Sequence, residues 1–106
     1  MGLKAVGRKK EADAEWLNAA LREEEVAFQL EAEGLDLLAA VHRISAASCY
    51  EEVKEYQRAL TLLHAALSVD MRAAYRAKIE KQLKGCLAKA RQQLRRRQRK
   101  QQVAVS

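Results

Sequence analysis

Four side chains in this sequence have the chemistry for metal binding or nucleophilic catalysis: His42, Cys49, His64 and Cys86. His42 and Cys49 are seven residues apart, on one face of a predicted helix, whereas His64 and Cys86 belong to other segments. None of these spacings matches a zinc site, and a histidine on an amphipathic helix is usually a partly exposed packing residue. The sequence therefore predicts no metal and no other cofactor.

The hydroxyl side chains give no better candidate for catalysis. Ser45, Ser48 and Ser68 have no acid–base partners in a triad pattern, and the sequence contains neither a glycine-rich phosphate loop nor an HExxH motif. An enzyme needs a nucleophile, an acid–base pair or a metal held in a pocket, so we expect no catalytic residue and no enzymatic activity. Both cysteines lie within helical patterns and are predicted to be small buried hydrophobes in a reducing compartment, with a disulfide between them as the alternative.

The composition predicts which elements hold these residues in place. The chain has 106 residues, four glycines and no proline, and it is dominated by helix-forming residues. The sequence predicts a single all-α domain, an antiparallel helical bundle joined by short turns. No apolar run approaches the roughly 18 to 20 residues that span a bilayer. Residues 1–10 lack the apolar core of a secretion signal, so we expect a cytoplasmic protein.

Apolar residues at helical spacing divide the chain into four predicted helices, over 11–33, 35–53, 55–69 and from Asp70 onwards. The predicted organisation is a flexible basic N-terminus over 1–10, an additional acidic helix over 11–34, a three-helix bundle over 35–97 and a disordered tail over 98–106. Turns are predicted at Gly34 and near Lys54. Asp13 and Asp70 are candidate helix caps.

Two apolar rows decide how the outer helices are predicted to pack. In the first helix, Trp16, Leu21 and Phe28 are too apolar to remain together in water, so this helix is expected to cover the bundle with them. In the last helix a regular row is expected to face the bundle: Tyr75, Ile79, Leu83, Leu87, Ala90 and Leu94.

The net charge of +6 is unevenly distributed. Residues 11–36 hold nine acids and one base, whereas residues 71–100 hold twelve bases and one acid. These regions are expected to attract one another within a chain or between copies, so a homo-oligomer is one alternative. The most basic stretch offers a possible phosphate or lipid contact through Arg95, Arg96, Arg97, Arg99 and Lys100. No aromatic residue is interleaved to stack on bases, so nucleic acid or an anionic membrane is the weaker alternative to a solvated helix end.

Residues 38–94 contain three groups of residues at characteristic spacings: Ala40, Ile44, Ala47 and Glu51; Tyr56, Ala59, Leu60, Leu63, Ala66 and Leu67; and Ile79, Leu87, Ala88, Lys89 and Ala90. This pattern resembles the MIT (microtubule interacting and transport) domain, a three-helix bundle of proteins that work with the ESCRT-III machinery. Paired MIT-like bundles at the C-termini of autophagy-initiating kinases show similar rows. The sequence departs from the family in a short interval between Tyr56 and Ile79, in Glu55 where glycine or asparagine is usual, and in the extra helix that precedes the match.

The resemblance implies a protein-interaction module that binds a short helical or extended peptide in an inter-helix groove, in membrane trafficking with ESCRT-III or in autophagy-related assembly. The groove residues that it implies are Leu62, Ala65, Gln82, Cys86, Leu87 and Arg91. Arg91 stands where the family often has an acid, so the expected ligand is an acidic segment, from a partner such as an ESCRT-III tail or from residues 11–33. Recruitment to endosomal or other membranes is implied as well.

A second resemblance, to the tetratricopeptide repeat, involves Tyr50, Tyr56, Ala59, Leu63 and Ala66 among others. That pattern should recur after about 34 residues. The corresponding positions are occupied instead by charged residues: Glu80, Lys81 and Lys84. One repeat cannot bury its own apolar face. The alternative function is therefore a self-associating or tetratricopeptide-like helical scaffold.

Overall fold

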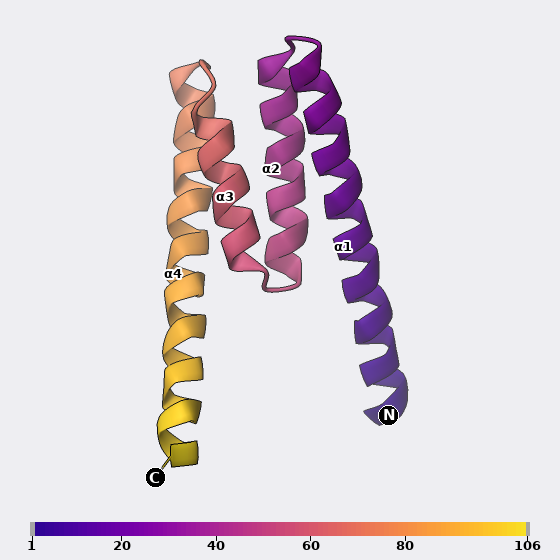
Figure 1. Ribbon diagram of the computed structural model, residues 1–106, viewed down its shortest axis with the longest axis vertical. Helices are drawn as coiled ribbons and strands as arrows, with labels where there is room; N and C mark the ends of the chain where they lie inside the picture. The colour runs from indigo at the N-terminus through magenta and orange to yellow at the C-terminus, as the bar shows by residue number, and fades with distance from the viewer. Residues whose placement is uncertain (1, 106) are drawn as a thin grey trace.

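The computed structural model describes residues 2–105, with side chains described for residues 7–102. Its elements are four helices: α1 (Gly2–Ala32), α2 (Asp36–Glu52), α3 (Tyr56–Leu67) and α4 (Ala73–Val105). No strand occurs in residues 2–105, so the predicted all-α class is confirmed. Figure 1 shows the helices side by side in chain order, each antiparallel to the next, with both chain termini at one end. The helices form a helical bundle in which α1 packs on α2, α2 on α3, and α3 on α4.

The turns after α1 and α2 are built in the same way. After α1, the Gly34 amide donates to the Glu31 carbonyl and the Leu35 amide to the Leu30 carbonyl, both at 2.9 Å. This pair of bonds is a Schellman motif, which requires a left-handed residue at its centre, and Gly34 has a φ of +79°. After α2, the corresponding residue is Lys54, with a φ of +61°. The predicted turns at Gly34 and Lys54 are therefore confirmed.

The interior is built mainly from alanine. Alanines buried completely or almost completely occur on three helices: Ala20 and Ala27 on α1, Ala39, Ala40, Ala46 and Ala47 on α2, and Ala59 and Ala66 on α3. Small side chains allow the helix axes to approach closely, and the remaining space is filled by a few larger residues. These are Tyr50, Leu63, Ile79 and Cys86.

The prediction for α1 is correct in part. This helix does lie along the bundle, and Ala20 belongs to the same buried cluster as Ala47 and Leu63. However, Trp16, Leu21 and Phe28 do not cover the bundle: the side chain of Phe28 is 74% exposed. The reason is steric, because a close α1–α2 contact through alanines leaves the large residues of α1 on the flanks of the interface.

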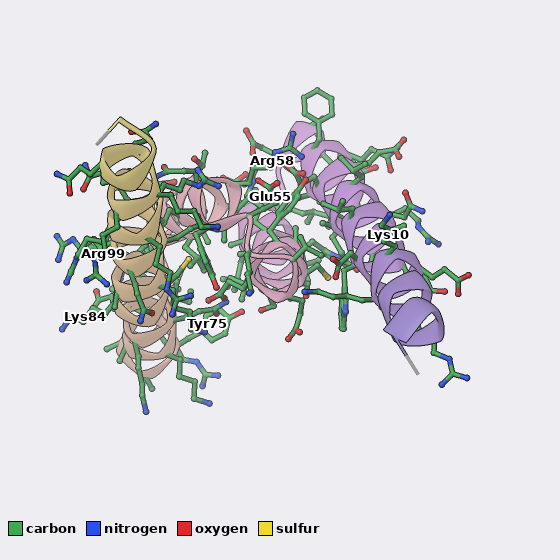
Figure 2. All side chains as sticks on the ribbon, turned by 90° about the horizontal axis from the view of Figure 1, so that it is seen from below. Lys10, Glu55, Arg58, Tyr75, Lys84 and Arg99 are labelled. Carbon is green, nitrogen blue, oxygen red and sulfur yellow. The ribbon has the colours of Figure 1, made fainter. Side chains whose placement is uncertain are left out.

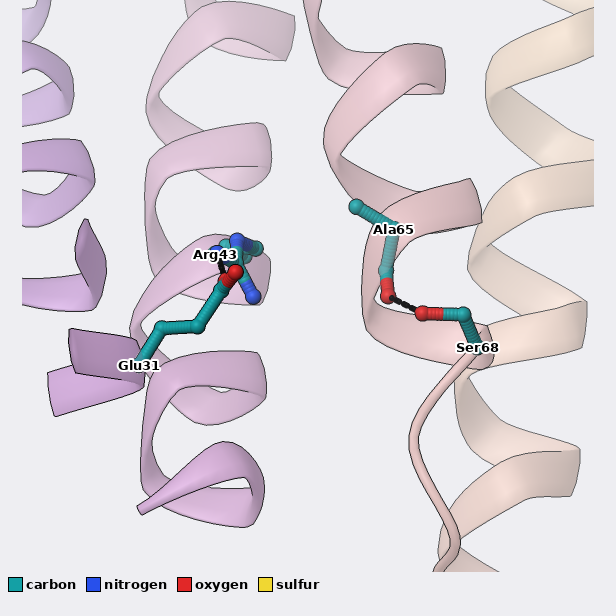
Figure 3. Close-up of polar contacts among 4 residues, drawn as sticks. All are labelled: Glu31, Arg43, Ala65 and Ser68. Atoms are coloured by element: carbon teal, nitrogen blue, oxygen red, sulfur yellow. Dashed lines mark hydrogen bonds and ion pairs between the residues drawn. The ribbon is translucent and has the colours of Figure 1, made fainter. Parts of the chain in front are cut away.

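The contact between α3 and α4 is fixed by Arg76. Its guanidinium donates to the carbonyl oxygens of Leu67 and Val69, both at 2.9 Å, and so satisfies acceptors that the end of α3 leaves free. The Ser68 hydroxyl donates to the Ala65 carbonyl at 2.6 Å, as Figure 3 shows.

The predicted cap at Asp70 is wrong, because α4 begins three residues later, at Ala73.

Both ends of the chain differ from the predicted boundaries. Within residues 2–105, α1 begins at Gly2 rather than near residue 11, and α4 continues to Val105 in place of a disordered tail over 98–106. Asp13 therefore lies inside α1 and is no cap. The lysine, arginine and glutamine residues of these segments are polar but have high helix propensity, and no proline interrupts either segment, so both ends are helical.

The apolar row predicted for α4 faces the bundle only in part. Ile79 is buried and Leu83 packs against the core, whereas Leu87 is 36% and Leu94 is 55% exposed. Leu94 is exposed because α3 has 12 residues and α4 has 33, so α3 ends before it. Leu87 lies next to the buried Cys86, and it is exposed because it lies to the side of the stripe that faces α3. None of the helices within residues 2–105 is both long enough and apolar enough to cross a membrane.

Candidate functional site

The residues predicted to form a groove do not come together in one place. Leu62 and Cys86 are buried, Ala65 is half-buried, and Leu87 and Arg91 are exposed. Leu62 lines a depression between α1 and α3, whereas Gln82 lies between α4 and α2. The Cys86 thiol contacts the Tyr56 carbonyl oxygen at 3.7 Å inside the α3–α4 interface. The basic residues Arg95, Arg96, Arg97, Arg99 and Lys100 are all exposed.

Two neighbouring depressions with a definite chemical character lie instead between α2 and α4, and together we call them the α2–α4 groove. Its apolar end is a depression of about 270 Å³ lined by Leu37, Val41, Met71, Arg72 and Tyr75. Leu37 is 48% and Val41 is 38% exposed. Figure 2 shows Tyr75 on the side of α4 that faces α2. Exposed aliphatic residues beside a half-buried tyrosine form an anchoring surface for an apolar side chain.

The basic end of the α2–α4 groove is a depression of about 440 Å³. It is lined by Glu51, Lys78, Lys81, Gln82, Gly85 and Lys89. The Gln82 amide nitrogen lies 2.8 Å from the Glu51 carboxylate and 3.1 Å from the Ser48 hydroxyl, so it joins α4 to α2 at the floor. Three lysines against one glutamate give this end a positive charge, which favours an acidic ligand.

The two walls of the groove have matching spacing, which is the pattern that sequence reasoning missed. On α4, Tyr75, Lys78, Gln82, Gly85 and Lys89 follow one another at intervals of three and four residues. On α2, Leu37, Val41, Ile44, Ser48 and Glu51 follow at the same intervals. Such rows lie along one face of each helix. In the sequence, the groove could have been predicted from a second apolar row on α2, which lies beside the buried alanines and consists of Leu37, Val41 and Ile44.

A second depression, of about 340 Å³, lies among α1, α2 and α3. Leu21, Glu24, Tyr50, Arg58, Thr61 and Leu62 line it. The Tyr50 hydroxyl donates to the Glu24 carboxylate, and the Arg58 guanidinium lies 5.5 Å from the Tyr50 ring centroid. Burial and the Glu24 carboxylate raise the pKa of Tyr50, while Arg58 lowers it. Because these polar groups already satisfy one another, this depression is an interhelical joint rather than a free binding site.

A third depression, of about 490 Å³, lies at the end of the molecule that holds the α1–α2 turn. It is mostly polar, with Glu31, Asp36, Arg43 and Asp70 among its lining residues. Arg43 on α2 is ion-paired with Glu31 on α1, as Figure 3 shows. A second pair joins α1 and α2, with His42 Nδ1 lying 2.6 Å from a Glu23 carboxylate oxygen. Arg43 is thus already paired, and the other charged residues of this depression, Asp36 and Asp70, are acidic, so it offers no free cation to an acidic ligand.

The two cysteine thiols do not line any of these depressions. Cys49 is half-buried, Cys86 is fully buried, and neither forms a disulfide. Burial raises the pKa of the Cys86 thiol to about 11, and nearby Glu51 adds to this rise, against the opposing effect of Lys89. Burial likewise raises the pKa of Cys49. Both thiols are therefore held protonated at neutral pH, which is the opposite of an activated nucleophile. Within the described residues, no three His, Cys, Asp or Glu side chains gather as a metal site would require.

The architecture thus defines an all-α helical bundle with an open, half-apolar and half-basic groove between two of its helices. No protein-family model, no curated protein and no solved structure matches this chain.

Proposed function

We propose that this chain is a protein-interaction module that binds an amphipathic, acidic helix of a partner protein in the α2–α4 groove. The observation on which the proposal depends is the apolar end of the groove, where Leu37 and Val41 are exposed beside Tyr75. Exposed aliphatic residues that line a depression between two parallel helix faces are typical of sites where a partner helix inserts apolar anchors.

The charge distribution supports one orientation of the ligand. The basic end, with Lys78, Lys81 and Lys89, lies towards the α2–α3 turn, while Leu37 lies at the start of α2. A ligand helix with apolar residues at one end and acidic residues at the other complements both ends at once. Glu51 in the basic end, held by Gln82, disfavours an acid directly opposite it and so contributes to register.

The resemblance to the MIT domain gives the proposal a more specific form. It suggests that the ligand is a tail segment of an ESCRT-III protein or of an autophagy-related assembly, met in the cytoplasm or on endosomal membranes. The structure supports the acidic preference by a different route from the one predicted, through the three groove lysines rather than through Arg91, which is exposed outside the groove.

The test uses two labelled helical peptides of about 20 residues, a length that spans one groove. Both have leucines at intervals of three and four residues in one half, and the other half carries glutamates in one peptide and lysines in the other. The acidic peptide should bind in fluorescence anisotropy and keep most of its affinity at high salt, because apolar burial supplies most of the free energy. The basic peptide should bind at least about ten-fold more weakly.

Matched variants locate the binding surface. Val41→Asp places a charge in the apolar depression and should weaken the acidic peptide by at least about ten-fold. Val26→Asp makes the same change on α1, at a position that is 37% exposed against 38% for Val41, and should have little effect. Equal weakening by both variants, or equal affinity for both peptides, would show that the groove is not the site. Synthetic ESCRT-III tail peptides in the same assay test the specific partner separately.

A further inference from the structure

A second surface, distinct from the α2–α4 groove, lies on the part of α4 that projects past the bundle. The last side-chain hydrogen bond of α4 to another helix or turn among the described residues runs from Gln93 to the Lys54 carbonyl, at 3.1 Å. Lys54 lies in the α2–α3 turn. In Figure 1, α4 continues well past this turn, with no helix beside its final turns. We call residues 94–102 the α4 extension.

The α4 extension carries a dense positive charge with no compensating acid. After Glu80 the chain contains nine bases and no acidic residue. The bases of the extension are Arg95, Arg96, Arg97, Arg99 and Lys100, and all are exposed. Both ion pairs found among the described side chains join α1 to α2, so none involves α4. A charge of this density attracts a polyanion strongly at physiological salt.

The arrangement of the bases around the helix indicates the shape of that polyanion. At about 100° per residue, the five bases from Arg95 to Lys100 spread over more than half of the helix circumference. A membrane is flat and contacts one side of a helix, so many of these bases would face away from it. The phosphates of the two strands line both sides of a helix inserted in a duplex groove. Basic side chains spread over a broad arc of the helix can therefore all contact phosphate.

The remaining residues favour a duplex over the other anionic surfaces. From Arg95 to Gln102 no apolar residue occurs, and Leu94 alone is too little apolar surface for the extension to bury a face among lipid chains. It also has no aromatic residue to stack on the bases of a single strand. The major groove of B-form DNA is wide enough for an α-helix, whereas that of duplex RNA is too narrow. Arginine binds phosphate oxygens in a bidentate manner, and the interspersed Gln98, Gln101 and Gln102 are neutral hydrogen-bonding residues.

From these observations we propose that the α4 extension binds double-stranded DNA by lying in the major groove, with its arginines on the phosphates of both strands. The binding is mainly electrostatic and has little sequence preference, since phosphate contacts carry no base information. With about five phosphate contacts, the affinity should fall about 500-fold between about 50 and 200 mM salt. This surface is separate from the α2–α4 groove, so each proposal stands or fails alone.

The test measures binding of the full chain to a labelled duplex DNA of about 20 base pairs by fluorescence anisotropy, over a series of salt concentrations. The quadruple variant Arg95→Gln, Arg96→Gln, Arg97→Gln and Arg99→Gln should lose at least about ten-fold in affinity at 100 mM salt, and most of the salt dependence. Glutamine is a good helix former, and circular dichroism verifies that the variant keeps its helicity.

Two controls separate the extension from net charge. The variant Lys78→Gln, Lys81→Gln, Lys84→Gln and Lys89→Gln removes the same number of charges from the packed half of α4 and should lose less than about three-fold. Replacing the same four arginines of the extension by lysine keeps the charge and should keep most of the affinity, because non-specific binding depends on charge.

Other anionic ligands complete the test. The single strand and the duplex RNA of the same sequence, and vesicles with about 30% phosphatidylserine, should all bind more weakly than the DNA duplex. The proposal is overturned by an absence of duplex binding at 100 mM salt, by equal losses in both charge-removal variants, or by tighter binding to the vesicles or to duplex RNA.

Discussion

Gln82 on α4 donates from its side-chain amide to the Glu51 carboxylate on α2 across 2.8 Å, and this bond closes the floor of the α2–α4 groove at its basic end. α4 packs mainly on α3, and this bond and the Ser48 contact of the same amide join it directly to α2. The charge on Glu51 makes the bond stronger than one between neutral groups.

Replacing Gln82 by glutamate should place two carboxylates together and remove the donor. We expect Gln82→Glu to lower the free energy of unfolding at pH 7 by about 1 kcal/mol, since the pair is only partly buried. Urea denaturation measures this change. Gln92→Glu introduces the same charge at an exposed position of α4 and should change stability by less than about 0.5 kcal/mol. Equal effects in the two variants would mean that the Gln82–Glu51 bond contributes nothing.

Arg76 joins the end of α3 to the start of α4 through two carbonyl oxygens. Arg76→Ala should leave these acceptors without a charged donor and lower the free energy of unfolding by about 1 to 3 kcal/mol. Arg76→Lys should recover part of the loss, because a single ammonium cannot match the two-pronged guanidinium. If lysine and alanine give the same stability in urea denaturation, the carbonyl contacts are not what Arg76 contributes.

Substitutions at the two turn residues with positive φ, Gly34 and Lys54, should have opposite effects on stability. At Gly34 the φ of +79° suits glycine, and a Cβ there would meet no other atom within 4 Å, so Gly34→Ala is opposed by backbone strain alone. It should destabilise the fold by about 1 kcal/mol. Lys54 adopts the same conformation with a side chain, so Lys54→Gly should be neutral or stabilise by up to about 1 kcal/mol. Thermal unfolding of both variants tests this difference, and a stabilising Gly34→Ala would contradict it.

The alanine interior predicts a strong dependence on side-chain size. Ala47 is fully buried in the central cluster, so Ala47→Leu should force α1 and α3 away from α2 and cost about 1 to 3 kcal/mol. Ala88 is exposed on α4, and Ala88→Leu makes the same chemical change with an expected effect under about 0.5 kcal/mol. Comparable denaturation midpoints for both variants would show that the helices are not closely packed at Ala47.

The Cys86 thiol should react slowly with alkylating reagents. Its pKa is raised to about 11, so at pH 8 its thiolate population is about 100-fold smaller than that of an ordinary thiol near 9. Mass spectrometry after iodoacetamide treatment should show slow labelling in the native protein and fast labelling in guanidinium. Native labelling as fast as denatured labelling would contradict the burial of this thiol.

The same raised pKa has a consequence for stability. A thiol with a folded pKa above its unfolded value stabilises the fold fully below about pH 9, and this contribution is lost as the pH rises through about 11. We therefore expect the free energy of unfolding to fall between about pH 9 and about pH 11. The Cys86→Ser variant should show a smaller fall over the same range.

The sequence by itself determined that the chain forms four helices and that turns occur at Gly34 and Lys54. An absence of proline, residues of high helix propensity and a glycine at the end of α1 are local features, and local hydrogen bonding decides these elements. The helical spacing of apolar residues also identified Ile79 and Leu83 as residues that face the bundle, because a helix can bury only one stripe.

Only the tertiary structure decided which faces meet. The apolar residues of α2 occupy more than one stripe, so the sequence is compatible with several neighbours. The close fit of alanine against alanine places Ala20 in the core and leaves Phe28 exposed. The α2–α4 groove has the same origin: Leu37 and Tyr75 are far apart in the chain, and only the packing of α3 against both α2 and α4 brings them to one depression. A spacing rule describes a single helix, whereas a groove depends on how closely two helices approach, and that is set by side-chain volumes summed over the whole interface.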